Sequence, residues 1–243
     1  MALLEARGIT VRFGGHVAVD AVDLEVEAGA VTGLIGPNGA GKTTTFNVLT
    51  GLQETTAGQV LLAGDDITRL ATHKRARRGL ARTFQKLEVF SSLTVWDNVL
   101  VATEIHGSFS GGGRRHHERT VAAVIDRVGL GAVAGERVDS LPTGQCRLVE
   151  LARALAIEPR VLLLDEPASG LDDGETRQFA DLLLDLVRDG LAILMVEHDV
   201  PLVMEVCEDI SVLDFGRVIA RGTPEEIQSN QDVLDAYLGS ELG

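Results

Sequence analysis

One glycine-rich segment has the residue types and the spacing of a loop that binds phosphate. The segment Gly36-Pro-Asn-Gly-Ala-Gly-Lys-Thr43 fits the pattern G-x-x-x-x-G-K-[ST]. It follows the short apolar run 31–35 and precedes the segment 42–52, whose apolar residues recur at helical spacing. Glycines let the backbone curl until several N–H groups face one anion, and the positive end of the following helix points at the same place. The segment therefore predicts a site for the phosphates of a nucleotide.

The residues of this loop have distinct expected roles. Lys42 would reach the β- and γ-phosphates, and the Thr43 hydroxyl would bind Mg²⁺. The loop residues expected to contact the nucleotide are Gly36, Asn38, Gly39, Ala40, Gly41, Lys42, Thr43 and Thr44.

Two acids end a second apolar run. Asp165 and Glu166 follow Val161-Leu-Leu-Leu164, about 120 residues after Lys42. An acid at the end of a buried strand is expected where hydrated Mg²⁺ must be held, so Asp165 is the candidate metal ligand. Glu166 could polarise an attacking water as a general base. The alternative interpretation is an ordinary strand end with two solvated acids.

Further short motifs follow in a fixed order, and together they resemble the ATP-binding subunit of an ABC transporter. Gln85 ends Ala81-Arg-Thr-Phe-Gln85 and resembles the Q-loop glutamine of that family. Leu141-Pro-Thr-Gly-Gln145 resembles the signature loop, Ser169-Gly-Leu-Asp172 the D-loop, and His198 the switch histidine. The order and spacing match from about residue 3 to about residue 228, nearly the whole chain.

The resemblance implies an ATPase that works as a pair. Two copies would pair head to tail and enclose two ATP molecules, each between the phosphate loop of one copy and Gly144 and Gln145 of the other. Because Gly144 opens a helical segment, its backbone N–H groups would face the γ-phosphate. The remaining implied roles are metal or water sensing by Gln85, orientation of Glu166 by His198, communication across the dimer by Asp172 and adenine stacking by Phe13.

The signature loop departs from the family pattern. The family usually has Leu-Ser-Gly-Gly-Gln, whereas this chain has Pro142 and Thr143 in the middle of the motif. Proline cannot donate an N–H group, and Thr143 could supply a hydroxyl or cap the following helix. We still expect ATP hydrolysis, because Lys42, Asp165 and Glu166 are intact; a subunit that binds nucleotide without hydrolysing it is the alternative.

The elements that must position these residues are those of an α/β protein. The apolar runs 161–164 and 192–196 show no alternation, which is typical of parallel strands buried on both faces. The segment 175–188 between them has helical spacing, so a right-handed βαβ unit is expected. Earlier in the chain, alternating apolar residues from position 22 to 26 indicate a half-exposed strand. The expected fold is a P-loop NTPase core, a parallel sheet flanked by helices, with an antiparallel β subdomain and a helical subdomain.

We expect one ABC ATPase domain over residues 1–243. Residues 1–86 and 157–243 would form a RecA-like core with the N-terminal β part. Residues from about 87 to 156 would form the helical subdomain that carries the signature loop. A glycine-rich stretch at 107–113 predicts a flexible break within that subdomain.

Composition excludes several classes of protein. The chain has 243 residues, 45% hydrophobic and 24% charged, so it is not disordered. Its net charge of −14 argues against binding nucleic acid. No apolar stretch of about 18 residues or more occurs, and no signal peptide is visible. Two cysteines without a metal pattern suggest a reduced, cytosolic compartment. Cys146 lies at an expected helix start, where its thiol pKa could fall.

The connecting sequence resembles the ATPases of branched-chain amino acid importers. The resemblance lies in 79–85, 93–100, 197–216 and 220–226. It implies that the segment after Gln85 forms a groove for a helix of the permease. The apolar candidates for that groove, which could instead pack in the core, are Phe90, Leu93, Val95 and Trp96. The implied partners are permease subunits, a second identical or homologous ATPase subunit and, indirectly, a substrate-binding protein, at the cytoplasmic face of the inner membrane.

Other interpretations stay open at this point. The motor of a lipid or lipopolysaccharide exporter would have closely similar motifs. A soluble ATP-gated clamp for DNA repair or ribosomes would need long coiled coils or a second ATPase unit. The stretch 69–86 holds seven Lys and Arg residues and no acid, which indicates a solvated helix face or a docking site for anionic lipid or an acidic loop.

Overall fold

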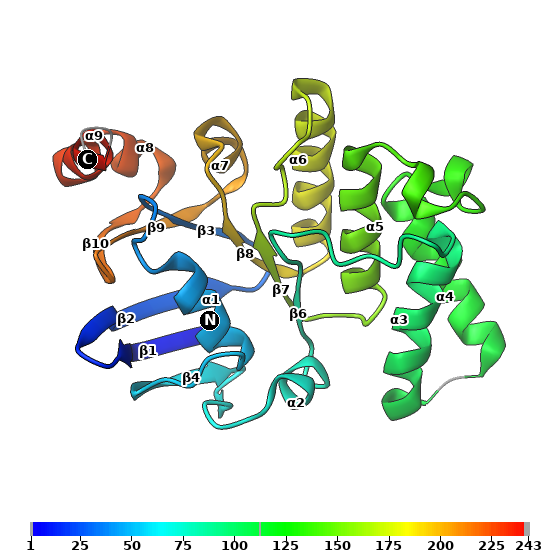
Figure 1. Ribbon diagram of the computed structural model, residues 1–243, viewed down its shortest axis with the longest axis horizontal. Helices are drawn as coiled ribbons and strands as arrows, with labels where there is room; N and C mark the ends of the chain where they lie inside the picture. Colours follow the sequence, from blue (N-terminus) through cyan, green and yellow to red (C-terminus); the bar gives the residue numbers. More distant parts are fainter. Residues whose placement is uncertain (1, 112, 241–243) are drawn as a thin grey trace.

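The computed structural model describes residues 2–111 and 113–240, and these form two β-sheets with helices around them (Figure 1). The larger sheet has the strand order β10-β9-β3-β8-β7-β6. Five of its strands are parallel, and β10 pairs antiparallel with β9. The strands are β3 (Val31–Ile35), β6 (Leu80–Arg82), β7 (Val161–Asp165), β8 (Ala192–Val196), β9 (Asp209–Asp214) and β10 (Arg217–Gly222).

The central strands carry the apolar runs. Every residue of β7 and β8 is buried, as the lack of alternation predicted, and every residue of β3 is buried as well. Helix α6 (Asp173–Arg188) connects the parallel strands β7 and β8, so the predicted βαβ unit is confirmed. Figure 1 shows α6 and α7 (Val200–Val206) on one side of this sheet and α1 (Lys42–Thr50) on the other.

The second sheet is antiparallel and lies below α1 in Figure 1. Its order is β2-β1-β4-β5, with β1 (Ala2–Phe13), β2 (His16–Glu27), β4 (Ala57–Leu62) and β5 (Asp65–Asp66). Buried and exposed residues alternate in the second half of β2, as predicted. Phe46 and Leu49 of α1 belong to one apolar cluster with residues of both sheets, so α1 packs between the two sheets.

Helices form a separate lobe between β6 and β7, on the right of Figure 1. They are α3 (Val95–Ser110), α4 (Arg114–Arg127), α5 (Thr143–Leu155) and two short 3-10 turns, Gly131–Val133 and Val138–Ser140. The predicted flexible break at 107–113 is wrong for residues 107–110, because α3 continues through Ser110. Gly112, also part of the predicted break, lies outside the described residues.

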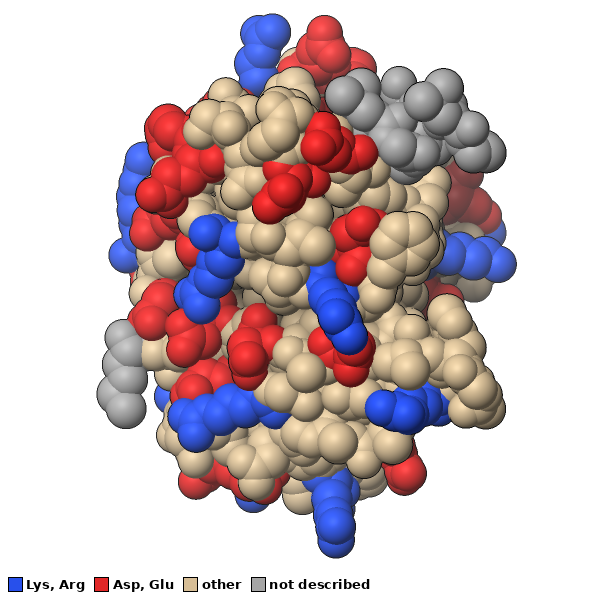
Figure 2. Space-filling model, turned by 90° about the vertical axis from the view of Figure 1, so that its left-hand side faces the viewer, with Lys and Arg blue, Asp and Glu red and all other residues tan. Residues whose placement is uncertain are grey.

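The remaining helices are α2 (Thr72–Ala76), before β6, and α8 (Pro224–Gln228) and α9 (Gln231–Ser240), after β10. On the face of the molecule in Figure 2, acidic side chains alternate with basic ones and with neutral surface. Among the described residues, no helix combines the length and the apolar composition that crossing a bilayer requires.

Candidate functional site

The glycine-rich loop joins β3 to the first residue of α1, Lys42, as the sequence predicted. Two of its glycines are required by close approach of other backbone. A Cβ atom at Gly36 would lie 2.0 Å from the carbonyl oxygen of Leu213, and one at Gly41 would lie 2.7 Å from that of Ala18. Both glycines also have positive φ angles, of 145° and 107°. Residues with a side chain at positions 36 and 41 would therefore clash with the neighbouring backbone and strain the curled conformation of this loop.

Lys42 lies folded over its own loop. Its Nζ donates hydrogen bonds to the carbonyl oxygens of Gly36, at 2.6 Å, and Pro37, at 2.9 Å. Burial lowers the pKa of Lys42, whereas the negative charges of Glu166 and Asp165 raise it. Asp165, the last residue of β7, and Glu166, the next residue, therefore stabilise the charged form of Lys42.

One pocket brings seven of the eight predicted phosphate-loop residues, all except Gly36, together with side chains from other segments. Its lining includes residues 38–44 and Phe13, Gln85, Glu166 and His198. Phe13 ends β1, and half of its surface is exposed, 50%. Gln85 follows β6, Glu166 follows β7 and His198 follows β8, so all three lie beyond the carboxyl ends of neighbouring parallel strands.

Glu166 is held from both sides. The Nε2 of Gln85 donates a hydrogen bond to its Oε2 at 2.9 Å. The Nε2 of His198 lies 2.9 Å from its Oε1. The backbone of Glu166 has a φ of 50°, in the left-handed region that non-glycine residues rarely adopt. A carboxylate with two polar neighbours and a strained backbone is a typical arrangement of a functional site.

Asp165 is buried and paired with an arginine. Its side chain is 6% exposed, and its Oδ2 lies 2.7 Å from Nη2 of Arg82. Arg82 was predicted only as part of the basic stretch, with no role at the site. The local signal for such a role is its position three residues before Gln85.

The basic stretch is not simply a solvated face. Arg75 is 2% exposed, and the Arg82 side chain is 7% exposed, because both donate hydrogen bonds inside the fold. The interpretation as a solvated face is therefore wrong for these two residues. The members of the stretch that are exposed are Arg69, Lys74, Arg77, Arg78 and Lys86.

The signature loop begins α5. Thr143 is the first helical residue and Pro142 occupies the capping position without a side-chain hydrogen bond, so the expectation that Thr143 caps the helix is wrong. Gly144 is buried, and a Cβ atom there would lie 2.4 Å from the Glu175 carboxylate. Gly144 and Gln145 line a different pocket from that of the phosphate loop.

Helix α5 holds the backbone next to Gln85. Nη2 of Arg147 donates to the carbonyl oxygen of Gln85 at 2.8 Å, and the Phe84 N–H donates to Oε1 of Glu150 at 3.1 Å. Burial raises the pKa of Glu150, and the hydrogen bond from Phe84 lowers it. Neither Arg147 nor Glu150 is among the predicted site residues, because their partners lie more than sixty residues away along the chain.

The D-loop aspartate, Asp172, caps α6. Its side chain accepts hydrogen bonds from the N–H groups of Gly174 and Glu175, and the N–H of Asp172 donates one to the Glu175 carboxylate. This reciprocal capping box fixes the start of α6 beside the pocket that Gly144 lines.

The expected low pKa of Cys146 is wrong. Cys146 is buried and burial raises its thiol pKa, so the helix start does not lower it. Val95 follows the second of the two interpretations, groove lining or core packing, because it is fully buried in the apolar core that the helical lobe shares with the larger sheet. Of the other three candidates for that groove, Phe90 is exposed and Leu93 and Trp96 are partly buried.

The last helix reaches the phosphate loop. Burial raises the pKa of Tyr237 on α9, and a hydrogen bond with the backbone of Gly36 lowers it. Tyr237 is not among the predicted site residues.

Comparison with known proteins agrees with this geometry. The family model for ABC transporters matches residues 19–169, and that for branched-chain amino acid ATP-binding cassette transporters matches residues 217–242. The chain is 42% identical to the branched-chain amino acid transport ATP-binding protein BraF of Pseudomonas aeruginosa and 41% identical to LivG of Escherichia coli. Each alignment covers 98% of both chains. The lipopolysaccharide export ATP-binding protein LptB of Escherichia coli is 36% identical, over 100% of this chain and 99% of that protein.

Solved structures share the whole fold. The ADP-bound form of an ATP-binding cassette of an ABC transporter has a TM-score of 0.87 and 28% identity, over 98% of this chain and 99% of that one. A nucleotide-free cassette gives the same values. The predicted P-loop NTPase fold is thereby confirmed. The chain belongs to the ATP-binding cassette family of ABC transporters, the ATPases that power transport.

Proposed function

We propose that this chain is the ATP-hydrolysing subunit of an importer for branched-chain or related amino acids. The observation that carries the enzymatic part is the Glu166 carboxylate, held between Gln85 and His198 at the edge of the phosphate loop. The choice of solute rests on the similarity to BraF and LivG and on the family model that matches residues 217–242.

In this proposal Glu166 is the general base. Gln85 and His198 hold its two oxygens, so the carboxylate is oriented before the attacking water arrives. Lys42 leaves the carbonyl oxygens of its own loop and binds the phosphates instead, since both partners of these bonds lie at the phosphate site. The exposed ring of Phe13 stacks on adenine.

The residues at the site fit Mg²⁺. Thr43, Asp165 and Gln85 offer a hydroxyl, a carboxylate and an amide oxygen, which are the ligands that this hard cation prefers. Within residues 2–111 and 113–240, no group of three or more His, Cys, Asp or Glu side chains forms a metal cluster. This suits an ion that completes its shell with waters and substrate phosphates. When bound, Mg²⁺ would neutralise charge on the β- and γ-phosphates.

The separate signature pocket supports a head-to-tail pair. Gly144 and Gln145 of one copy would complete the nucleotide site of the other, with backbone N–H groups at the start of α5 facing the γ-phosphate. Asp172 would transmit contact between the copies. The second copy is identical or homologous.

We assign the other partners by analogy with the transport relatives. The pair would drive permease subunits from the cytoplasmic face of the inner membrane, with a substrate-binding protein acting indirectly and no role for nucleic acid. Residues 1–86 and 157–243 would act as the core, and residues 87–156 as a helical subdomain that moves toward the partner copy.

Two variants test the enzymatic proposal. Lys42→Ala should lose nucleotide affinity, because the phosphates lose their cation. Glu166→Gln should keep nucleotide affinity, lower turnover by about 10²–10⁴-fold, and accumulate an ATP-bound dimer on a sizing column. Steady turnover by Glu166→Gln, or elution only as a monomer with ATP, contradicts the assigned roles.

A lipid-type exporter is the second candidate, because the lipopolysaccharide export protein LptB is 36% identical over the full chain. Affinity capture from native membranes in mild detergent separates the two. Permeases that import labelled leucine into proteoliposomes, when combined with this chain and ATP, support the importer. Co-purification with lipopolysaccharide export proteins, without leucine uptake, supports the exporter.

A further inference from the structure

The guanidinium of Arg82 joins three parts of the nucleotide site. Arg82 is the last residue of β6. Its Nη2 donates to Oδ2 of Asp165 at 2.7 Å, and its Nη1 donates to Oδ1 of Asn47 at 2.6 Å. Asp165 ends β7, and Asn47 lies on α1, the helix that carries Lys42 and Thr43. One planar group therefore fixes the end of β7 relative to the helix behind the phosphate loop.

The surroundings of this group restrict its position. Its side chain is 7% exposed and that of Asp165 is 6% exposed, so water does little to screen the pair. The guanidinium carbon lies 5.5 Å from the ring centre of Phe46 and 4.9 Å from that of Phe84. Phe84 immediately precedes Gln85. The cation is thus held by rings from α1 and from the Q-loop as well as by its hydrogen bonds.

Building on the proposed function, we propose that Arg82 is a positioning residue for ATP hydrolysis. It orients the Asp165 carboxylate toward the Mg²⁺ that accompanies ATP, and it sets the distance between that carboxylate and Thr43 through Asn47 and α1. Buried carboxylates that bind metals need such outer partners, whose removal costs about 10–100-fold in metal affinity or activity. The pairing also balances the charge of Asp165 while the site holds no cation.

Lysine cannot replace arginine in this role. The fork of Arg82 bonds Asn47 and Asp165 through different nitrogens, and its flat face lies between two rings. A lysine ammonium is a single point of charge on a flexible stem. Arg82→Lys therefore keeps the charge and loses the geometry, and Arg82→Gln loses both.

The test measures metal binding directly. Mn²⁺ replaces Mg²⁺, and its binding to the full chain with a non-hydrolysable ATP analogue is followed by electron paramagnetic resonance. We expect Arg82→Gln to weaken Mn²⁺ binding by about 10–100-fold and Arg82→Lys to weaken it less. Binding of the analogue in EDTA should stay close to that of the wild type. In steady state, kcat should fall while the KM for ATP at saturating Mg²⁺ stays nearly constant.

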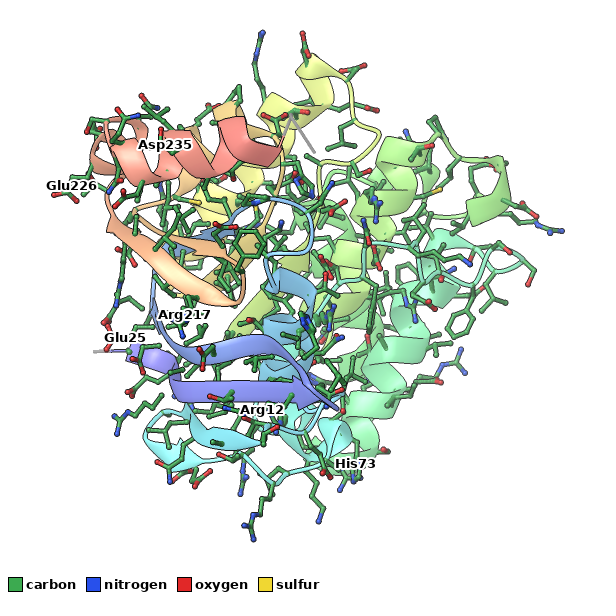
Figure 3. All side chains as sticks on the ribbon, turned by 60° about the vertical axis from the view of Figure 1, so that its left-hand side comes forward. Arg12, Glu25, His73, Arg217, Glu226 and Asp235 are labelled. Carbon is green, nitrogen blue, oxygen red and sulfur yellow. The ribbon has the colours of Figure 1, made fainter. Side chains whose placement is uncertain are left out.

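Two further variants separate positioning from folding. Asn47→Ala removes one anchor and leaves the pair of Arg82 with Asp165, so it should weaken Mn²⁺ binding in the same direction and by a smaller factor. Arg221→Gln is the matched control, because Arg221, like Arg82, bonds two side chains through different nitrogens, here those of Asp209 and Glu25, and it lies outside the nucleotide pocket. Glu25 is labelled in Figure 3. This control should leave Mn²⁺ binding unchanged.

Several results would overturn the inference. Wild-type affinity for Mn²⁺ in folded Arg82→Gln would make Arg82 purely structural, and tighter binding would make it a competitor of the metal. A wild-type chain that fails to bind Mn²⁺ with the analogue would contradict the metal site and this inference together. A wild type that binds both but does not hydrolyse ATP would contradict the proposed function and would leave intact the positioning of the metal-binding carboxylate by Arg82.

Discussion

At the scale of single residues, Glu166 combines function with backbone strain. Its φ of 50° lies in the left-handed region, where an L-residue with a long side chain costs on the order of 1 kcal/mol. The conformation brings the carboxylate between Gln85 and His198, at 2.9 Å from each. The backbone conformation of Glu166 therefore lowers the stability of the fold and at the same time places its carboxylate between Gln85 and His198.

A pair of amide variants isolates that strain. Glu166→Asn and Glu166→Gln both remove the proposed general base, but asparagine adopts left-handed angles more readily than glutamine. We expect Glu166→Asn to be more stable than Glu166→Gln in urea unfolding by about 0.5–1 kcal/mol, with ATP turnover strongly lowered in both. Equal unfolding free energies would show that the backbone at this position carries no strain.

The buried thiol of Cys207 should make the unfolding free energy fall with rising pH in the alkaline range. Burial is the main cause that raises its thiol pKa from 9.0 to about 12, and the Asp209 charge adds to it. The unfolded chain loses this proton at lower pH than the native chain, so stability is complete below about pH 9 and falls as pH rises toward 12. The largest slope is about 1.4 kcal/mol per pH unit.

The measurement is urea unfolding between pH 8 and pH 11, with Cys207→Ala as the comparison. The difference in unfolding free energy between wild type and variant should shrink as pH rises. Parallel pH dependences would show that Cys207 ionises in the native state as readily as in the unfolded chain.

Residues with a short motif around them were predictable from the sequence, and residues with distant partners were not. Lys42, Gln85 and His198 lie in segments whose neighbours identify them, and all three line one pocket. Arg82 contacts Asp165, 83 positions away, and no local pattern specifies that pair. Long-range side-chain pairs require the fold before they can be recognised.

At the scale of elements, α1 depends on an arginine at its C-terminal end. Arg75 donates from Nη1 to the carbonyl oxygens of Val48, at 2.6 Å, and Leu49, at 2.7 Å, in the last turn of α1. Burial lowers the pKa of Arg75 to about 10, and the charge of Asp66 raises it. A buried cation at the negative end of the helix satisfies carbonyl groups that the helix itself cannot.

Replacing that cation should loosen the helix behind the phosphate loop. Arg75→Met leaves several buried carbonyl groups without a donor, so we expect the unfolding free energy to fall by about 3 kcal/mol or more. Arg78→Met, at an exposed neighbour, should change it by less than about 0.5 kcal/mol. Similar losses for both variants in urea unfolding would contradict a capping role for Arg75.

The order of the elements was predictable, and their ends were less so. Unbroken apolar runs identified β7 and β8, because parallel strands covered on both faces need no polar residues. The start of α5 was misjudged, because Pro142 takes the capping position and Thr143 the first helical one. The sequence left Val95 open between groove and core, and the structure places it in the core directly after the capping residue Thr94 of α3.

At the scale of the whole molecule, the two groups of nucleotide-binding candidates lie in different pockets. The phosphate loop, Gln85 and Glu166 line one, and Gly144 and Gln145 line the other. Helix α5 connects them, since Arg147 bonds the carbonyl oxygen of Gln85. Movement of α5 would therefore displace the backbone at Gln85. In the proposed pair, closure on the partner copy would then move the residue beside the proposed general base.

The separation of these pockets determines the kinetic order of the reaction. If one copy must supply Gly144 to another, the ATPase rate in dilute solution should rise with the square of the protein concentration and become linear once pairs dominate. Assays over a dilution series measure this exponent, and a value of one throughout would contradict a shared site. A permease that holds two copies side by side converts the encounter into an intramolecular step. For the two ATPase copies, attachment to the permease would act as a high effective concentration of one copy near the other.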